Sequence, residues 1–292
     1  ATMSESRVTT TESVPLIPRS VLFGNPDKAA PRLSPDGTQL AFLAPLDGVL
    51  NVWVAPVDDI AAARPVTRDT QRGIMIYFWS YAPNRLIYLQ DKEGNENWHV
   101  HVVNLETDEA RNLTPVEGVR AIIENVDYKF PNEILIGLNN RTPELFDIYR
   151  LNILTGERTL IQENPGFSSF ITDDQYRIRF AARMLPDGGR EILEPLKDGE
   201  WTTFMQIDMA DAMTTSPIGF DKTGNILYLI DSRGRNTAAM VTRDLRTGDV
   251  TTVAENPKAD TADALIKPKE QTIQAVAFDY ERKHWQFIDP EV

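Results

Sequence analysis

The chain has 292 residues, of which 41% are hydrophobic, and a formal net charge of −13 at pH 7. A field of that sign repels phosphate groups, so we expect neither nucleic acid nor an anionic membrane as a partner. No stretch approaches the roughly 20 apolar residues that a membrane-spanning helix needs. The absence of cysteine excludes disulfides and thiolate chemistry.

The first residues are polar and include three consecutive threonines, Thr9, Thr10 and Thr11. We predict a disordered tail over residues 1–13, followed by one β-propeller domain over residues 14–292. No charged region followed by an apolar core is visible at the start of the sequence, so no secretory signal is indicated. We therefore expect a cytoplasmic location.

Short turn-forming segments recur along the chain at a nearly fixed spacing. The clearest three begin at Asn104, Asn152 and Asp244, which lie 48 and then 92 residues apart, and 92 is twice 46. Degenerate copies at residues 196–200 and 57–59 fall on the same register. A period of this length, built of strands, is typical of a β-propeller.

One period contains four strand-like segments. They are residues 74–79, 85–90, 98–103 and 110–113, each rich in β-branched or aromatic residues or alternating in polarity. Turn-forming residues separate them, and Pro115 ends the unit. The sequence therefore predicts an all-β fold made of four-stranded antiparallel blades, which are joined internally by hairpins.

The second strand of the unit can be followed through the whole chain. It is expected at residues 40–43, 86–89, 134–138, 178–181, 226–230 and 275–278. Pro or Gly in several of the preceding turns supplies the backbone angles that tight hairpins require. The first strands are expected to be the innermost ones, at residues 74–79, 121–126 and 217–220.

The repeat predicts five complete blades and an incomplete sixth. The last unit begins near Gln271 and reaches residues 285–288, while its outer strand is missing. An open blade edge exposes backbone donors and acceptors and invites pairing with another chain, so self-association through this edge is one expectation. Alternatively, the segment at residues 14–22 supplies the strand, or further blades follow in a longer protein.

A search for hydrolase chemistry finds no Gly-x-Ser-x-Gly pentapeptide. The nearest cluster, residues 166–170, lacks the second glycine and is expected to open a strand. A Ser–His–Asp triad also needs a histidine, and the sequence offers only His99, His101 and His284. We therefore assign no catalytic residue.

Two of the histidines have a spacing that metal ligands can use. His99 and His101 would project from the same face of a strand, and Glu96 or His284 could supply a third ligand. A half-buried structural face is the more ordinary interpretation, so we assign neither a metal-binding nor a cofactor-binding residue. Glu124 is the one acidic residue of the expected innermost strands and the candidate for carboxylate chemistry in a channel.

Large aromatic residues recur at corresponding places in the expected blades. They are Trp53, Tyr77, Phe78, Trp79, Trp98 and Trp285. Face-to-face sheets bury large side chains between them, so we expect packing between blades rather than a ligand platform.

Several motifs together resemble the opening of bacterial prolyl oligopeptidase family members, of the acylaminoacyl-peptidase or dipeptidyl-peptidase-like kind. They are residues 17–26, 31–37, 48–54 and 90–99, in that order, and the likeness extends from about Pro15 to Val292. The resemblance implies an N-terminal propeller that caps a C-terminal α/β-hydrolase domain with a Ser–Asp–His triad. No triad position of the family falls within this chain, so the resemblance implies a propeller part that is inactive alone.

From this resemblance we expect a non-catalytic propeller that restricts access to a serine peptidase of short peptides. Its expected partners are the C-terminal hydrolase domain and, in the intact enzyme, short peptide substrates. A free-standing propeller that scaffolds protein–protein interactions is the alternative from a different class. A hydrolase or binding protein centred on Glu124 is a third possibility.

Overall fold

The computed structural model describes residues 14–292, so the disordered tail predicted over residues 1–13 lies outside the described part of the chain. The chain divides into two compact units, with the boundary in the sequence between Met75 and Ile76, and each unit is described by itself. Throughout the described residues, paired strands are antiparallel and follow one another in chain order within each sheet. The all-β prediction is confirmed.

The first unit holds one four-stranded sheet with the order β1-β2-β3-β4. Its strands are β1 (Ala29–Leu33), β2 (Gln39–Leu46), β3 (Val49–Pro56) and β4 (Arg64–Pro65), with the short 3-10 helix η1 (Ile60–Ala62) before β4. The two-residue turn between β2 and β3 consists of Asp47 and Gly48, whose φ angles of 51° and 82° suit a tight hairpin.

The segment at residues 14–22 does not supply a strand. Residues 14–18 have no regular structure, and α1 (Arg19–Phe23) is a short helix. Proline explains this difference, because Pro15 and Pro18 lack the N–H that strand pairing requires. Pro18 directly precedes the helix, where its fixed φ is compatible with a helix start.

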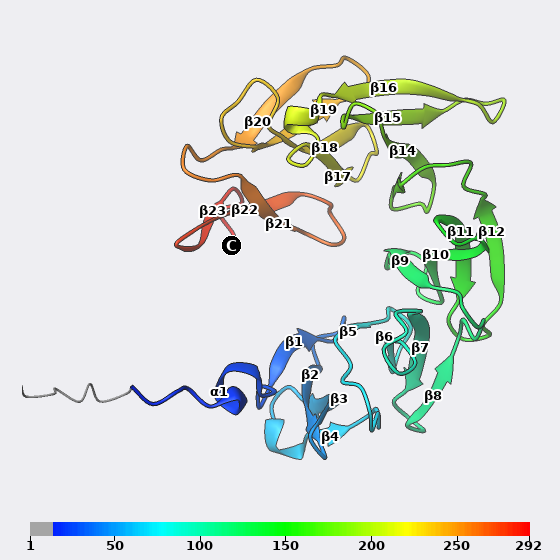
Figure 1. Cartoon of the computed structure of the whole chain (residues 1–292), viewed down its shortest axis with the longest axis vertical. Helices are drawn as coiled ribbons and strands as arrows, with labels where there is room; N and C mark the ends of the chain where they lie inside the picture. The colour runs from blue at the N-terminus through cyan, green and yellow to red at the C-terminus, as the bar shows by residue number, and fades with distance from the viewer. Residues whose placement is uncertain (1–13) are drawn as a thin grey trace, which may run out of the picture. The chain divides into compact units, whose positions relative to one another are not determined.

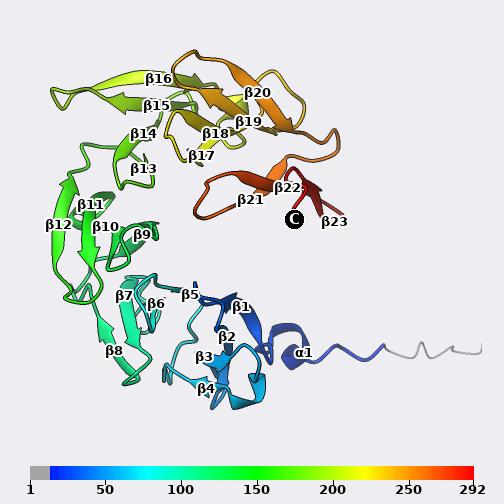
Figure 2. The same ribbon diagram turned by 180° about the vertical axis from the view of Figure 1, so that it is seen from behind.

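The second unit holds five sheets, which follow one another in chain order from cyan to red in Figures 1 and 2. The first sheet has β5 (Ile76–Trp79), β6 (Arg85–Gln90), β7 (His99–Asn104) and β8 (Glu109–Asn112). The second has β9 (Ala121–Asn125), β10 (Glu133–Thr142), β11 (Leu145–Asn152) and β12 (Arg158–Gln162). The third has β13 (Ser169–Thr172), β14 (Ile178–Met184), β15 (Arg190–Pro195) and β16 (Trp201–Ile207).

The remaining two sheets of this unit differ in strand number. After the 3-10 helix η2 (Met209–Asp211), one sheet has β17 (Ser216–Phe220), β18 (Ile226–Asp231), β19 (Ala239–Asp244) and β20 (Val250–Ala254). The last has only three strands, β21 (Thr261–Ile266), β22 (Ile273–Tyr280) and β23 (Arg282–Phe287). The described residues thus form six blades, five with four strands and one with three.

The predicted repeat corresponds to this architecture. Each expected second strand lies within β2, β6, β10, β14, β18 or β22. The recurring turns at residues 104–109, 152–157 and 244–249 connect the third strand of a sheet to the fourth. The degenerate copies at residues 57–59 and 196–200 lie in the same connection, and η1 lengthens the first of them.

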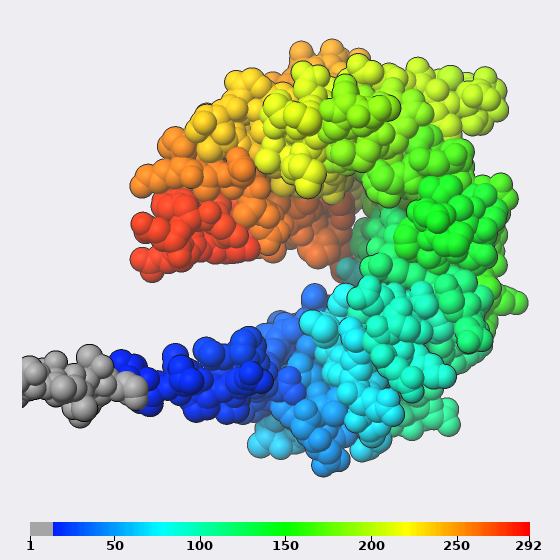
Figure 3. Space-filling model, viewed as in Figure 1, coloured from blue at the N-terminus to red at the C-terminus, as the bar shows by residue number. Residues whose placement is uncertain are grey.

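The hydrophobic core of the second unit lies between successive sheets rather than within any one of them. Leu135 and Ile148 of one sheet, for example, pack with Phe170 and Ala181 of the next. Comparable clusters join β6 and β7 to β10, β14 and β15 to β18, and β19 to β22. Figure 3 shows the atoms of these neighbouring sheets in contact along the unit. This core explains the apolar second strands, which are covered on both faces.

None of the helices in the described residues is long and apolar enough to cross a membrane.

Candidate functional site

A cavity of about 340 Å³ lies within the second unit, where the connections between first and second strands converge. All five sheets of this unit contribute to its lining. The lining residues are Tyr81, Asn125, Val126, Asp127, Thr172, Asp173, Asp174, Ile218, Gly219, Phe220, Asp221, Ile266, Pro268 and Gln271. Four of them are aspartates and none is basic, so we call this cavity the acidic pocket.

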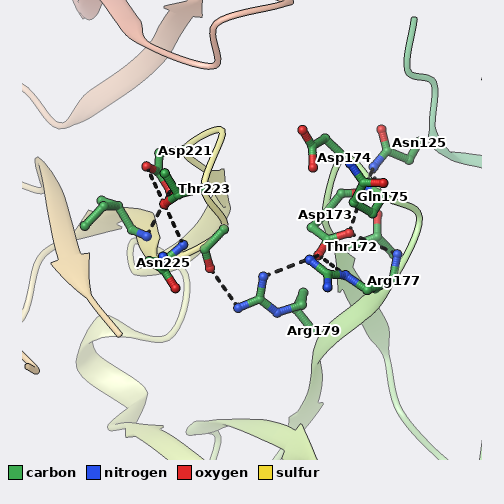
Figure 4. Close-up of polar contacts among 12 residues, drawn as sticks. Asn125, Thr172, Asp173, Asp174, Gln175, Arg177, Arg179, Asp221, Thr223 and Asn225 are labelled. Carbon is green, nitrogen blue, oxygen red and sulfur yellow. Dashed lines mark hydrogen bonds and ion pairs between the residues drawn. The ribbon is translucent and has the colours of Figure 1, made fainter. Parts of the chain in front are cut away.

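Asp173 is the most heavily bonded carboxylate of the acidic pocket (Figure 4). Its Oδ2 accepts hydrogen bonds from Arg177 Nε at 2.8 Å and from Arg179 Nη1 at 3.3 Å. Its Oδ1 accepts the backbone N–H groups of Gln175 and Arg177 at 2.9 and 3.0 Å. The side chain is buried, and these two guanidinium groups compensate its charge.

The same hydrogen-bond network links three successive sheets around the pocket. Arg179 of β14 donates through Nη2 to the carbonyl of Gly224 at 2.9 Å, in the turn before β18. On the other side, Asn125 of β9 donates to Thr172 Oγ1 and to the carbonyl of Asp173, both at 3.0 Å. Figure 4 shows these side chains reaching across from neighbouring sheets. The pocket wall is therefore cross-linked by hydrogen bonds that are independent of strand pairing.

The remaining carboxylates of the pocket differ in how their charge is balanced. Asp174 forms an ion pair with Lys129. Asp221 accepts the hydroxyl of Thr223 at 2.8 Å and the N–H of Ile226 at 3.0 Å, which closes the turn before β18. Asp127 accepts the N–H of Lys129 at 2.9 Å. Neither Asp127 nor Asp221 forms a salt bridge with the described residues, and the nearby Lys129 ammonium offsets the charge of Asp127 only in part.

Burial disfavours the ionised form of Asp127, whose exposed fraction is 5%. The pKa of its carboxyl is raised by this burial, although the N–H of Lys129 acts in the opposite direction. The pKa of the nearby Tyr81 phenol is also raised, by burial and then by the charge of Asp127. A positively charged group that entered the pocket would stabilise the ionised forms of Asp127 and Tyr81 and so lower both raised pKa values. The pocket therefore suits a cationic ligand group.

The histidines that the sequence offered as metal ligands have other contacts. His99 Nδ1 lies 2.9 Å from Asn112 Nδ2, and its Nε2 lies 3.1 Å from the carbonyl oxygen of Val116. The amide nitrogen of Asn112 can only donate and the carbonyl oxygen of Val116 can only accept, so the proton of a neutral His99 is on Nε2. His101 stacks on Tyr88 with ring centroids 4.8 Å apart.

His284 lies in β23 and stacks on Tyr280 at 4.3 Å. Glu96 precedes β7 and donates its backbone N–H to Asp91. Among the described residues, no group of three or more His, Asp or Glu side chains is placed to hold a metal ion. The structure therefore does not bring the four candidates together.

The position of His99 in its blade explains why the residue is polar. Asn51 and Asp147 lie 48 residues before and after it and also stand near the start of a third strand. Asn51 Oδ1 accepts the N–H of Asp69, and Asp147 Oδ1 accepts the N–H of Asn164, both at 2.7 Å. In each case the side chain ties the segment after the fourth strand to the third strand, which is a structural role.

Glu124 lies on β9 and does not line the acidic pocket. The pairing of β9 with β10 shifts between Asn125 and Ile123, so Glu124 is the extra residue of a β-bulge. Burial raises the pKa of its carboxyl to about 7. Because bulges and raised carboxyl pKa values also occur in purely structural settings, we assign no chemistry to Glu124.

The Ser168 and Ser169 cluster has the predicted structural role. Ser169 begins β13, and the hydroxyl of Ser168 donates to the carbonyl of Ala182 at 2.9 Å. Among the aromatic residues expected to pack between blades, Tyr77 is buried, and Phe78 and Trp98 pack against a core cluster. Trp285 is an exception, because 40% of its surface is exposed at the last sheet.

No family model matches the chain. It is 44% identical over 278 residues to dipeptidyl aminopeptidase BIII of Pseudoxanthomonas mexicana, and the match covers 95% of this chain and 40% of that protein. It is 29% identical over 291 residues to dipeptidyl peptidase family member 6 of Caenorhabditis elegans, with 93% and 39% covered. The chain thus spans about two fifths of the length of these curated relatives.

Two solved peptidase structures share the fold. A prolyl endopeptidase matches with a TM-score of 0.62 at 8% identity, over 90% of this chain and 41% of the other. Dipeptidyl peptidase 4 of Porphyromonas gingivalis matches with a TM-score of 0.53 at 16% identity, over 87% and 42%. The chain is thus similar in sequence to about two fifths of a dipeptidyl aminopeptidase, and it shares the propeller fold of these solved structures.

Sequence reasoning missed the pocket of this propeller segment, although a signal for it was present. The residue that opens the turn between first and second strands is Asp127, Asp173 or Asp221 in three successive blades, with spacings of 46 and 48 residues. Ser34 and Ser80 occupy the same place in the two preceding blades. Three aspartates at the blade period, at the same ends of neighbouring sheets, predict a shared acidic opening.

Proposed function

We propose that this propeller segment is the non-catalytic, substrate-gating part of a serine peptidase that hydrolyses short peptides. The observation that carries the proposal is its 44% identity to dipeptidyl aminopeptidase BIII over 95% of the chain. The match covers 40% of that relative, so a partner domain would supply the remaining functions. We propose an α/β-hydrolase domain as this partner, in keeping with the prolyl oligopeptidase family that the chain resembles.

The acidic pocket supports a role in peptide admission. A short peptide with a free amino terminus carries a compact positive charge, and the carboxylates of Asp127 and Asp221, which form no salt bridge with the described residues, attract such a group. A cavity of about 340 Å³ has room for the end of a short peptide but not for a folded protein. The hydrogen bonds of Asp173 and Arg179 hold the rim of this cavity rigid, so the propeller can select peptides by size without a moving segment.

A chimera tests this function directly. Residues 14–292 would replace the matching segment of dipeptidyl aminopeptidase BIII, and the purified chimera would be assayed on a chromogenic dipeptidyl substrate and on casein. We expect hydrolysis of the small substrate and intact casein. The isolated chain, assayed in parallel, should hydrolyse neither substrate, because the proposal places catalysis in the partner domain.

Two results would contradict the proposal. A folded chimera that degrades casein as fast as the small substrate would show that the propeller does not gate access. Hydrolysis by the isolated chain would place catalysis in the propeller itself, and loss of that activity in Glu124→Gln would then identify the carboxylate responsible. Circular dichroism of each protein confirms that the comparison is between folded molecules.

A further inference from the structure

A second cavity in the second unit, of about 240 Å³, lies between the sheet of β13–β16 and the sheet of β17–β20. Both sheets have four strands within the described residues, and the cavity shares no lining residue with the acidic pocket. The lining residues are Ile178, Arg179, Phe180, Glu194, Pro195, Phe204 and Leu245. They come from β14, β15 and β16 and from the position that follows β19, and we call this cavity the inter-sheet cleft.

The walls of the inter-sheet cleft are mostly apolar, since five of its seven lining residues are aliphatic or aromatic. Phe204 is half-buried, and its ring centroid lies 4.6 Å from that of the buried Phe180. The pairing of β15 with β16 shifts between Thr203 and Met205, so Phe204 is the extra residue of a β-bulge. Bulges re-aim side chains and are frequent beside active sites. The cleft therefore suits a ligand with an apolar group of about the size of one side chain.

Glu194 supplies the one carboxylate of this lining. It lies near the end of β15, is exposed, and forms no hydrogen bond or ion pair with the described residues. The other carboxylate of the same strand, that of Glu191, is buried and forms an ion pair with Arg183 at 2.6 Å. The carboxylate of Glu194 is therefore placed to accept charge-assisted hydrogen bonds from an ammonium group of a ligand in the cleft.

Arg243 of β19 brings a positive charge to the apolar wall. Its guanidinium carbon lies 4.7 Å from the centroid of the Phe204 ring. Because side chains alternate along a strand, Arg243 projects on the same face as Val241 and Leu245, which pack in the core between the two sheets. Its Nε is buried without a hydrogen-bond partner, and its guanidinium forms no ion pair with the described residues. A half-buried guanidinium without a counter-charge suits the carboxylate of a ligand.

Arg179, the other arginine at the cleft, is already engaged in the wall. Its guanidinium donates to Asp173 at 3.3 Å and to the carbonyl of Gly224 at 2.9 Å. It also lies over the ring of Phe220, 4.5 Å from the centroid. The charge of Arg179 is therefore balanced within the chain, whereas that of Arg243 is not.

We propose that the inter-sheet cleft binds one free α-amino acid with a large apolar side chain. The ammonium group of the ligand pairs with Glu194, its carboxylate pairs with Arg243, and its side chain lies against Phe204 and Leu245. The volume of the cleft is below the roughly 300–1,000 Å³ of pockets for drug-sized ligands, so it holds a single amino acid rather than a longer peptide. This site is independent of the proposed peptidase role, because it uses neither the acidic pocket nor a hydrolase domain.

The first test titrates the full chain, labelled with ¹⁵N, with L-phenylalanine and follows the backbone N–H signals by NMR. We expect saturable shifts at residues of the cleft, such as Phe204 and Leu245, with a dissociation constant of about 1 mM or lower. Phenylalanine amide lacks the carboxylate and 3-phenylpropionate lacks the ammonium group, so each should bind about 10-fold more weakly. Equal affinities of the three compounds, the absence of saturable shifts, or shifts confined to the acidic pocket would each overturn the proposal.

Two variants test the charged partners of the ligand. Arg243→Gln should weaken binding of L-phenylalanine about 10-fold and leave the affinity for phenylalanine amide unchanged, because that compound has no carboxylate. Glu194→Gln should weaken L-phenylalanine to a similar extent and leave the affinity for 3-phenylpropionate unchanged. Arg158→Gln and Glu157→Gln, at exposed positions of the preceding sheet, are the matched controls and should change no affinity. If either cleft variant binds L-phenylalanine as tightly as wild type, or weakens all three compounds alike, the proposed site is overturned.

Discussion

The hydroxyl oxygen of Tyr176 accepts the backbone N–H of Asp127 at 2.9 Å, which joins two neighbouring sheets at the rim of the acidic pocket. The same hydroxyl donates to the carbonyl of Glu133 at 2.9 Å, so both of its bonding functions cross between sheets. The ring of Phe130 stacks on the Tyr176 ring at 4.6 Å, and burial raises the pKa of the phenol. Tyr176 thus fixes the segment that carries the buried carboxyl of Asp127.

Replacing Tyr176 by Phe should therefore lower the free energy of unfolding by about 1–3 kcal/mol, because it leaves the buried N–H of Asp127 and the part-buried carbonyl of Glu133 without the hydroxyl that pairs them. Urea denaturation measures the change. Tyr128→Phe is the matched control, since the Tyr128 hydroxyl makes no hydrogen bond within the described residues, and it should change the free energy by less than about 0.5 kcal/mol. Equal effects of the two variants would show that the bridging hydroxyl contributes nothing.

Thr114 provides a second buried tie, at the segment that follows β8. Its Oγ1 accepts the N–H of Val100 at 2.9 Å, and the residue is fully buried. Thr114→Val keeps the shape and removes the acceptor, so the free energy of unfolding should fall by about 1–2 kcal/mol. Thr114→Ser retains the hydroxyl and should lose less. If Ser and Val are equally destabilising, packing of the methyl group rather than the hydrogen bond explains the loss.

The order of the strands followed from the sequence because each blade repeats the same turn chemistry, as at Asn104 and Asn152. The polar ties between blades did not, because they join residues far apart in sequence, such as Asp127 and Tyr176. His99 illustrates the limit: its polarity was visible, but its role depends on Asn112 and on the carbonyl of Val116. The exposure of Trp285 was missed because burial depends on the neighbouring sheet and not on the residue type.

Gly137 occupies the middle of β10, where a strand normally favours a larger residue. A β-carbon at this position would lie 2.7 Å from Ile122 Cγ1 and 3.1 Å from Phe146 Cβ. Gly137→Ala should therefore destabilise the protein by about 1–3 kcal/mol, as overpacked cores do. Gly137→Ala combined with Ile122→Ala, which removes both Cγ1 and Cδ1 that the β-carbon would meet, should recover part of the Gly137→Ala loss when it is compared with Ile122→Ala alone in thermal denaturation. No recovery would point to the backbone rather than to this contact.

Negative charge around the acidic pocket predicts that peptide admission depends on salt. In the proposed chimera, kcat/KM for a cationic dipeptidyl substrate should fall several-fold between about 0.02 and 0.3 M salt, because screening weakens electrostatic steering. An otherwise equal acidic substrate should not show this fall. Asp221→Asn should reduce the salt dependence for the cationic substrate. Identical salt profiles for both substrates would exclude a steering role of the pocket.

The raised pKa of Glu124 predicts that the stability of the chain falls as the pH rises. Its carboxyl has a pKa of about 7 in the folded chain, against a usual value of 4.5, because it is desolvated. Between these values the folded state binds the proton more tightly than the unfolded state, so stability is greatest below about pH 4.5 and falls as the pH rises to 7. Glu124→Gln removes this loss. It should be more stable than wild type by up to about 3 kcal/mol at pH 8 and gain nothing at pH 4.5.

Urea denaturation of wild type and Glu124→Gln at pH 4.5, 6 and 8 measures this difference. The exposed residue Glu117 serves as control, since Glu117→Gln should give the same small difference at each pH. If the difference in free energy of unfolding between Glu124→Gln and wild type does not grow with pH, the carboxyl of Glu124 ionises in the folded chain as it does in water. If the difference in free energy of unfolding grows between pH 4.5 and 8, the ionised carboxyl of Glu124 destabilises the fold. This is expected because Glu124 has no hydrogen-bond or ion-pair partner among the described residues.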